Sequence, residues 1–159
     1  MCGIPRPSTG HRIAIMFPSA SPSPSPSSSP SSSPACSPEP PSKESYTLSF
    51  QDSDSDSLTK AILRSKDTTT LDAFRTQCSQ IDLRIERHGD LTLKTETQPL
   101  HHFQLHPPET ANTDEMEFSL PQRLDLNVSD RGIVGRQVTV TARGEGGVVS
   151  VGSGIVGFD

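Results

Sequence analysis

The sequence predicts a β-rich α+β protein in which a disordered N-terminal arm precedes one small domain. Three observations support this prediction. A Ser/Pro-rich stretch fills residues 18–41, most later segments alternate apolar and polar residues, and two short segments have helical spacing. We expect the arm to span residues 1–43 and the domain residues 44–159. Two short helices and six to seven short, mostly antiparallel strands would make this domain an α+β or β-barrel-like module.

The arm is predicted from its composition. Eleven of the 15 prolines lie within residues 1–41. Proline fixes φ and removes a backbone donor, and serine has little apolar surface to bury, so this stretch cannot repay the entropy of ordering. The run Ile13–Phe17, which Pro18 ends, is too short for the apolar region of a signal peptide or for a membrane helix. The arm is therefore expected to be extended and solvated.

The first elements of the domain are predicted to be one strand and two helices. Residues 46–50 alternate apolar and polar side chains, which indicates a strand. After an acidic loop over residues 51–57, Ser57 or Asp56 is a good N-cap for a helix over residues 58–66. Thr70 is positioned to cap a second helix, whose apolar face would carry Leu71, Phe74 and Cys78.

The rest of the domain is predicted to consist of strands and turns. Residues 81–85 and 91–95 alternate around His88-Gly89-Asp90, the pattern of a β-hairpin, and residues 99–115 have the prolines of a loop. Alternation resumes over residues 116–120 and 124–128. Residues 138–142 and 148–151 flank a glycine-rich turn, which predicts a second hairpin.

Three motif matches do not hold, so we expect no cofactor and no metal. Residues 152–157 match GxGxxG, but the helix and strand that a dinucleotide site needs do not follow. Asp52, Asp54 and Asp56 have the spacing of a calcium loop, yet Leu63 stands where that loop needs a bidentate Glu. The cluster His101, His102 and His106 lies between prolines with no further ligand beside it, which favours a solvated loop.

No catalytic residue is predicted either, and we expect that the protein is not an enzyme. The cysteines Cys2, Cys36 and Cys78 are far apart in the sequence, so reduced thiols are expected rather than a disulfide framework. Cys78 falls on the apolar face of a predicted helix, where a small buried hydrophobic residue is the ordinary role. No nucleophile elbow, phosphate loop or zinc-protease motif is present in the sequence.

The composition points to a regulated protein partner. A net charge of −5 without a basic stripe argues against binding to nucleic acid or to a membrane surface. Serines followed by proline in the arm, and serines among aspartates after residue 52, are candidate phosphorylation sites. These candidates are Ser21, Ser23, Ser25, Ser29, Ser33, Ser37, Ser53, Ser55 and Ser57.

The first functional hypothesis is therefore a non-enzymatic protein-interaction or regulatory module of the cytoplasm or nucleus, with a phosphorylatable disordered arm. One alternative is an accessory or small-ligand-binding β domain imported into a plastid or mitochondrion. Its Ser-rich N-terminus, which has no acidic residue before Glu39, would be a transit peptide. Another alternative is a fragment or a weakly selected open reading frame, because aromatic residues make up only 4% of the chain.

Overall fold

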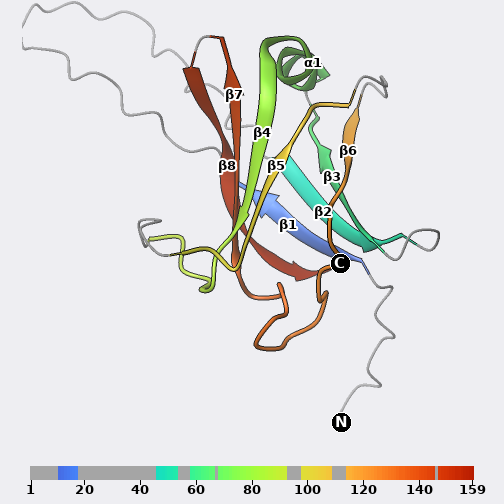
Figure 1. Ribbon diagram of the computed structural model, residues 1–159, viewed down its shortest axis with the longest axis vertical. Coiled ribbons are helices and arrows are strands. Elements are labelled where there is room, and N and C mark those ends of the chain that lie inside the picture. The colour runs from blue at the N-terminus through green and yellow to red at the C-terminus, as the bar shows by residue number, and fades with distance from the viewer. Residues whose placement is uncertain are drawn as a thin grey trace, which may run out of the picture.

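The computed structural model describes residues 11–17, 46–53, 58–66, 68–92, 98–108, 114–145 and 147–159. Within these ranges the chain forms eight strands and one helix (Figure 1). The helix is α1 (Thr68–Gln77). The strands are β1 (Arg12–Met16), β2 (Tyr46–Asp52), β3 (Thr59–Arg64), β4 (Cys78–Ile85), β5 (His101–Leu105), β6 (Glu115–Ser119), β7 (Gln137–Gly144) and β8 (Gly147–Phe158).

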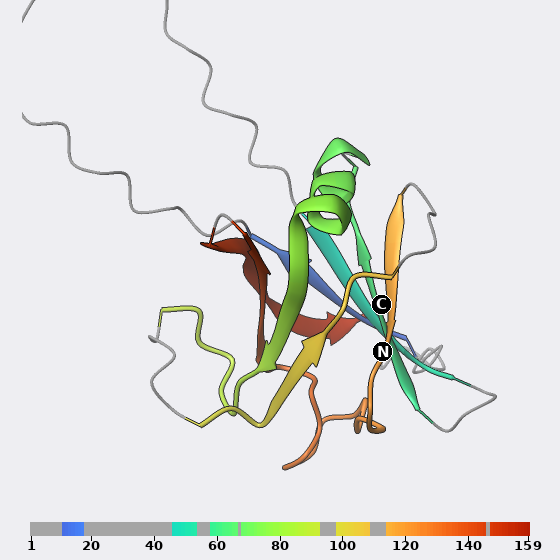
Figure 2. The same ribbon diagram turned by 45° about the horizontal axis from the view of Figure 1, so that its top comes forward.

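All eight strands belong to one antiparallel sheet with the order β5-β4-β7-β8-β1-β2-β3-β6. The long strand β8 pairs with β7 along most of its length and with β1 near its end, so that it joins the two halves of the sheet. The sheet curls until its two end strands, β5 and β6, lie on the same side of the molecule (Figure 2). The result is a nearly closed β-barrel, which confirms the β-rich prediction but not the expected two helices.

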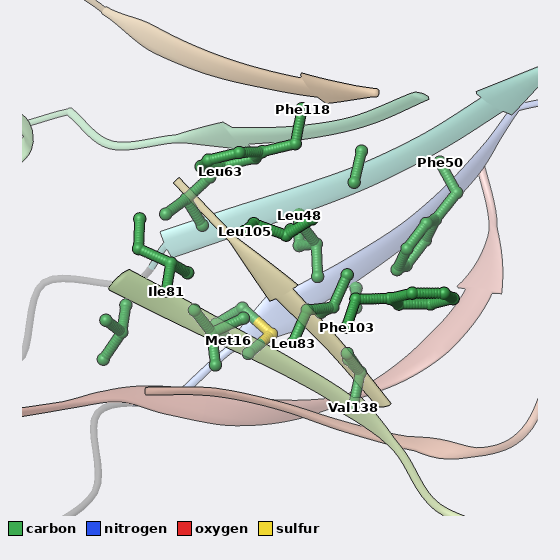
Figure 3. Close-up of a cluster of buried hydrophobic side chains, with 14 of the residues drawn as sticks. Met16, Leu48, Phe50, Leu63, Ile81, Leu83, Phe103, Leu105, Phe118 and Val138 are labelled. Atoms are coloured by element: carbon green, nitrogen blue, oxygen red, sulfur yellow. The ribbon is translucent and has the colours of Figure 1, made fainter. Parts of the chain in front are cut away.

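The inside of the barrel is filled by side chains from every part of the sheet. Every second residue of these strands places its side chain on the inner face, because successive residues of a strand point to opposite faces, and most of these inward side chains are apolar. Helix α1 adds Leu71 and Phe74 at one end, where the Phe74 ring lies 6.2 Å from the Tyr46 ring. Figure 3 shows how the inner side chains meet, among them Met16, Leu48, Phe50, Leu63, Ile81, Leu83, Phe103, Leu105, Phe118 and Val138.

The largest correction concerns the N-terminal arm. Residues Arg12–Met16, which we expected to be disordered, form β1 in the middle of the sheet between β8 and β2. The sequence RIAIM alternates inward and outward side chains, and five residues suffice for a strand that is hydrogen-bonded on both sides. The expectation of disorder is therefore wrong for residues 12–16. Residues 1–10 and 18–45 lie outside the described residues.

The predicted helix over residues 58–66 is also wrong, because this segment forms β3 and pairs with β2 and β6. Its apolar residues fit a helical period and a period of two equally well, and the neighbouring strands decide between them. The N-cap expected at Ser57 or Asp56 therefore has no helix to cap, although these two residues themselves lie outside the described residues. The second predicted helix is present as α1, but it begins at Thr68, so Thr70 is not its N-cap, and Cys78 belongs to β4 and not to the helix.

The first predicted hairpin is only half correct. Residues 81–85 belong to β4, but its neighbours are β5 and β7, and Leu91 and Thr92 lie in a turn. Residues 93–97 lie outside the described residues. Gly89, expected as a hairpin turn, has another role: a Cβ atom there would lie 2.0 Å from the carbonyl oxygen of Gly135, so glycine permits the close approach of two loops.

The loop predicted over residues 99–115 contains β5, which the cluster of histidines concealed. Phe103 and Leu105 point inward at alternate positions, so the segment has strand periodicity despite its polar composition. The strand predicted over residues 116–120 is confirmed as β6, and the second hairpin is confirmed as β7 and β8. Residues 124–128 form no strand; they make one isolated bridge, from Asp125 to Gly132. Residues 152–157, the GxGxxG match, lie inside β8.

Candidate functional site

The outer side of β1, near the centre of the sheet, carries two exposed apolar side chains. Ile15 is 56% exposed, and Phe17, which follows β1 and bridges to Ser153, is 58% exposed. Ile13 lies two residues before Ile15 and points the same way, because Arg12, Ala14 and Met16 take the inward positions. We call the outward side chains Ile13, Ile15 and Phe17, together with Ile155 of β8, the β1 face.

The strands on both sides of the β1 face add small or neutral side chains to it. On β2 the outward neighbours of Ile13 and Ile15 are Ser49 and Thr47, and on β8 the residue opposite Ile13 is Gly157. None of these outward side chains is Asp, Glu, Lys or Arg. This part of the barrel surface is therefore apolar along β1 and uncharged at the neighbouring positions of β2 and β8.

The outer side of β4, in contrast, is charged and internally paired. Asp82 accepts hydrogen bonds from Arg143 Nε at 2.9 Å and from Gln80 Nε2 at 3.0 Å, and His102 Nε2 lies 3.4 Å from its carboxylate. Arg84 Nε lies 2.5 Å from Glu86 Oε1. Most of these polar groups bond to one another, although the buried Glu86 Oε2 accepts no hydrogen bond from the described residues.

The structure separates the three histidines that the sequence places together. His101 Nδ1 lies 2.7 Å from Gln122 Nε2, His102 points outward to Asp82, and His106 Nδ1 lies 3.1 Å from the Ser79 carbonyl oxygen. Burial lowers the pKa of the His101 ring, and the positive charge of Arg136 lowers it further. Among the described residues, no group of three or more His, Cys, Asp or Glu side chains is placed to hold a metal ion.

A cleft of about 530 Å³ opens at one end of the barrel beside residues 123–127. Its buried wall is Arg12, whose Nε donates to the Leu126 carbonyl oxygen at 2.5 Å and whose guanidinium lies 4.6 Å from the centre of the Phe158 ring. Arg123 pairs with Asp52 at 2.9 Å across the rim. The polar groups of this cleft thus hold the barrel end together.

A second pocket, of about 470 Å³, lies where α1 meets β4 and includes Cys78. Burial raises the pKa of the Cys78 thiol, which keeps it protonated and makes it a poor nucleophile. Cys78 is partly buried and packs against the hydrophobic core, but from the start of β4 and not from the helix face predicted for it. Cys2 and Cys36 lie outside the described residues.

Of the nine candidate phosphorylation sites, only Ser53 lies among the described residues. It follows β2, and its backbone NH donates to the Leu58 carbonyl oxygen at 2.8 Å, so it begins the connection from β2 to β3. The sites Ser21 to Ser37 fall within residues 18–45, between β1 and β2. They belong to an internal connection between two paired strands, since Met16 is the ladder partner of Tyr46.

The sequence matches no family model and no curated protein. No helix among the described residues is long and apolar enough to cross a membrane. The β1 face was missed from the sequence because its residues were assigned to the arm. The alternation in residues 12–17 is the signal that identifies it.

Proposed function

We propose that this chain is a non-enzymatic protein-interaction module and that the β1 face is its binding surface. The observation that carries the proposal is the exposure of Ile15 and Phe17, each by more than half, in the centre of an uncharged part of the sheet. Contiguous apolar surface in a soluble protein marks a contact with another molecule more often than isolated exposed residues do. The expected partner is a protein with an apolar, uncharged contact surface.

Phosphorylation of the Ser/Pro segment would regulate this contact. The segment leaves the sheet at Phe17 and returns at Tyr46, beside the β1 face. Each phosphate adds about −1.5 to −2 charges and disrupts a contact when it lies next to an apolar interface. We therefore expect phosphate on Ser21 or Ser23, the two candidate sites nearest to Phe17 in the sequence, to weaken partner binding.

A small-ligand carrier, the second candidate, receives less support. Barrels that carry a ligand keep a cavity among their inner side chains. Here the inner positions hold large apolar side chains that form one cluster (Figure 3), and the two clefts lie beside residues 123–127 and where α1 meets β4.

The test compares the partners that are cross-linked to the protein in its own cells. The double variant Ile15→Thr/Phe17→Thr places a residue with high strand propensity at both positions but removes most of the apolar surface. Val148→Thr is the matched control, because Val148 is 61% exposed and lies at the far end of β8. The proposal expects one or more partners to be lost from the double variant and retained by the control. Identical partners for all three proteins would contradict it.

A further inference from the structure

Strand β1 is held in the barrel along both of its edges. It pairs with β2 from Arg12↔Phe50 to Met16↔Tyr46 and with β8 from Arg12↔Phe158 to Ala14↔Val156. Beyond β1, Phe17 and Ser153 exchange two backbone hydrogen bonds, of 2.8 and 3.0 Å. Every residue from 12 to 17 therefore takes part in at least one ladder or bridge.

The inward side chains of β1 are completely or almost completely buried. Ala14 and Met16 are 0% exposed, and Arg12 is 3% exposed under residues 124–127. The neighbouring strand is adapted to this fit: a Cβ atom at Gly154 would lie 2.3 Å from the Ile15 carbonyl oxygen, so only glycine lets β8 approach so closely. The space between β8 and β2 is therefore a groove shaped for one strand.

The covalent connection from β1 to its neighbour β2 runs through residues 18–45, a Ser/Pro-rich segment. We propose that the groove between β8 and β2 is a strand-binding site, which holds residues 11–17 after the chain is cut within residues 18–45 and then exchanges them for an equivalent strand.

The groove defines the chemistry of the strand that it takes. The first inward position needs a long cation that reaches the Leu126 carbonyl oxygen and the Phe158 ring. The second inward position needs a small apolar residue, and the third needs a larger one beside Tyr46. The outward positions are free to vary. The strand that meets these requirements is residues 11–17 of a second cut copy of this chain.

This inference goes beyond the proposed function, because it concerns the inner face of β1 and not the outer one. Cleavage within the Ser/Pro segment would turn a one-chain protein into a two-chain protein whose central strand is replaceable. Strand addition of this kind obtains affinity from backbone hydrogen bonds and specificity from alternate side chains.

The experiment uses the full chain with a specific protease sequence placed between residues 24 and 32. After cutting, size-exclusion chromatography under native conditions should show the fragment that contains β1 eluting together with residues 46–159. A fluorescent peptide of residues 9–19 should then bind to the cut protein and not to the uncut one. Separate elution of the fragments, unfolding of the cut protein, or equal uptake by the uncut protein would overturn the proposal.

Two competitor peptides test the two faces of the strand separately. Met16→Asp would bury an unpaired carboxylate, so this peptide should compete at least about tenfold more weakly than the unmodified peptide. Ile15→Thr changes an outward position and should compete as well as the unmodified peptide. Equal competition by Met16→Asp would show that the peptide does not enter the groove. Loss of competition by Ile15→Thr would show binding through the outer face instead.

Discussion

The assignment of residues 12–16 to the sheet is tested most directly by two neighbouring substitutions, Met16→Ala and Ile15→Ala. Met16 is completely buried among the inner side chains of the barrel, whereas Ile15 is 56% exposed on the outer face (Figure 3 labels Met16). If this stretch were a disordered arm, neither substitution would change the free energy of unfolding. If it is β1, the two substitutions must differ strongly.

The expected size follows from burial. Truncating a buried Met to Ala removes its transfer free energy and leaves a cavity, which costs about 2–5 kcal/mol. Truncating Ile15 removes half-exposed surface and some strand propensity, which costs less than about 1 kcal/mol. Since a domain of this size is stabilised by only about 5–15 kcal/mol, the first effect is large enough to measure easily.

Urea unfolding followed by far-UV circular dichroism is the suitable assay, because the chain has no Trp to serve as a fluorescent probe. If the free energy of unfolding depends on urea concentration with the same slope in all variants, a difference between their unfolding midpoints reports a difference in stability. A Met16→Ala protein within about 0.5 kcal/mol of the unsubstituted chain would refute the placement of β1. Equal losses for both variants would refute the inward and outward alternation.

Three further measurements follow from the same structure. Gly154→Ala should cost about 1–3 kcal/mol, because its Cβ would meet a backbone oxygen at 2.3 Å, whereas Gly157→Ala, with 3.8 Å, should stay within about 0.5 kcal/mol. Thr59→Val should cost about 1–3 kcal/mol, since it leaves the buried NH of Leu124 without its acceptor; an unchanged urea midpoint would contradict this. Because the pKa of His101 is lowered in the folded state, the unfolded chain binds more protons than the folded chain just below about pH 6.5. The free energy of unfolding therefore decreases as the pH is lowered through that range. His101→Gln should flatten that part of the stability profile, and an equally steep profile would exclude His101 as its source.

The sequence predicts those elements whose pattern is local. The β7–β8 hairpin and β6 follow from strict alternation and glycine turns, and α1 follows from Leu71 and Phe74 on one helical face. The interior also follows, because most residues expected to be apolar and inward are buried.

Elements that depend on distant partners could not be predicted. Residues 58–66 fit two periods, and only the ladders to β2 and β6 select the strand. In the same way, the turn chemistry at Gly89 favoured a local hairpin, but β4 pairs with residues 101–105 and 137–144 instead. Long-range pairing of this kind leaves no local signal.

The candidate site was missed for a different reason, which lies in composition. A Ser/Pro-rich segment begins directly after Phe17, and its strong disorder signal hid the alternation of the six residues before it. A proline-rich composition predicts disorder for the segment that has this composition and not for the residues beside it. The uncharged surroundings of Ile15 are formed by β2 and β8, which lie far away in the sequence, so no local analysis of residues 12–17 would reveal them.

The position of β1 also bears on the hypothesis of organelle import. A transit peptide removed near residues 35–45 would leave β1 without a covalent bond to the domain, although β1 occupies the middle of the sheet. If β1 then departed, the inner side chains of Leu48 and Val156 would lose the strand between them and face water. The import hypothesis therefore requires either that the cut strand stays bound in its groove or that another strand replaces it. In both cases the groove between β8 and β2, rather than the sequence of the cleaved segment, determines whether the barrel remains folded.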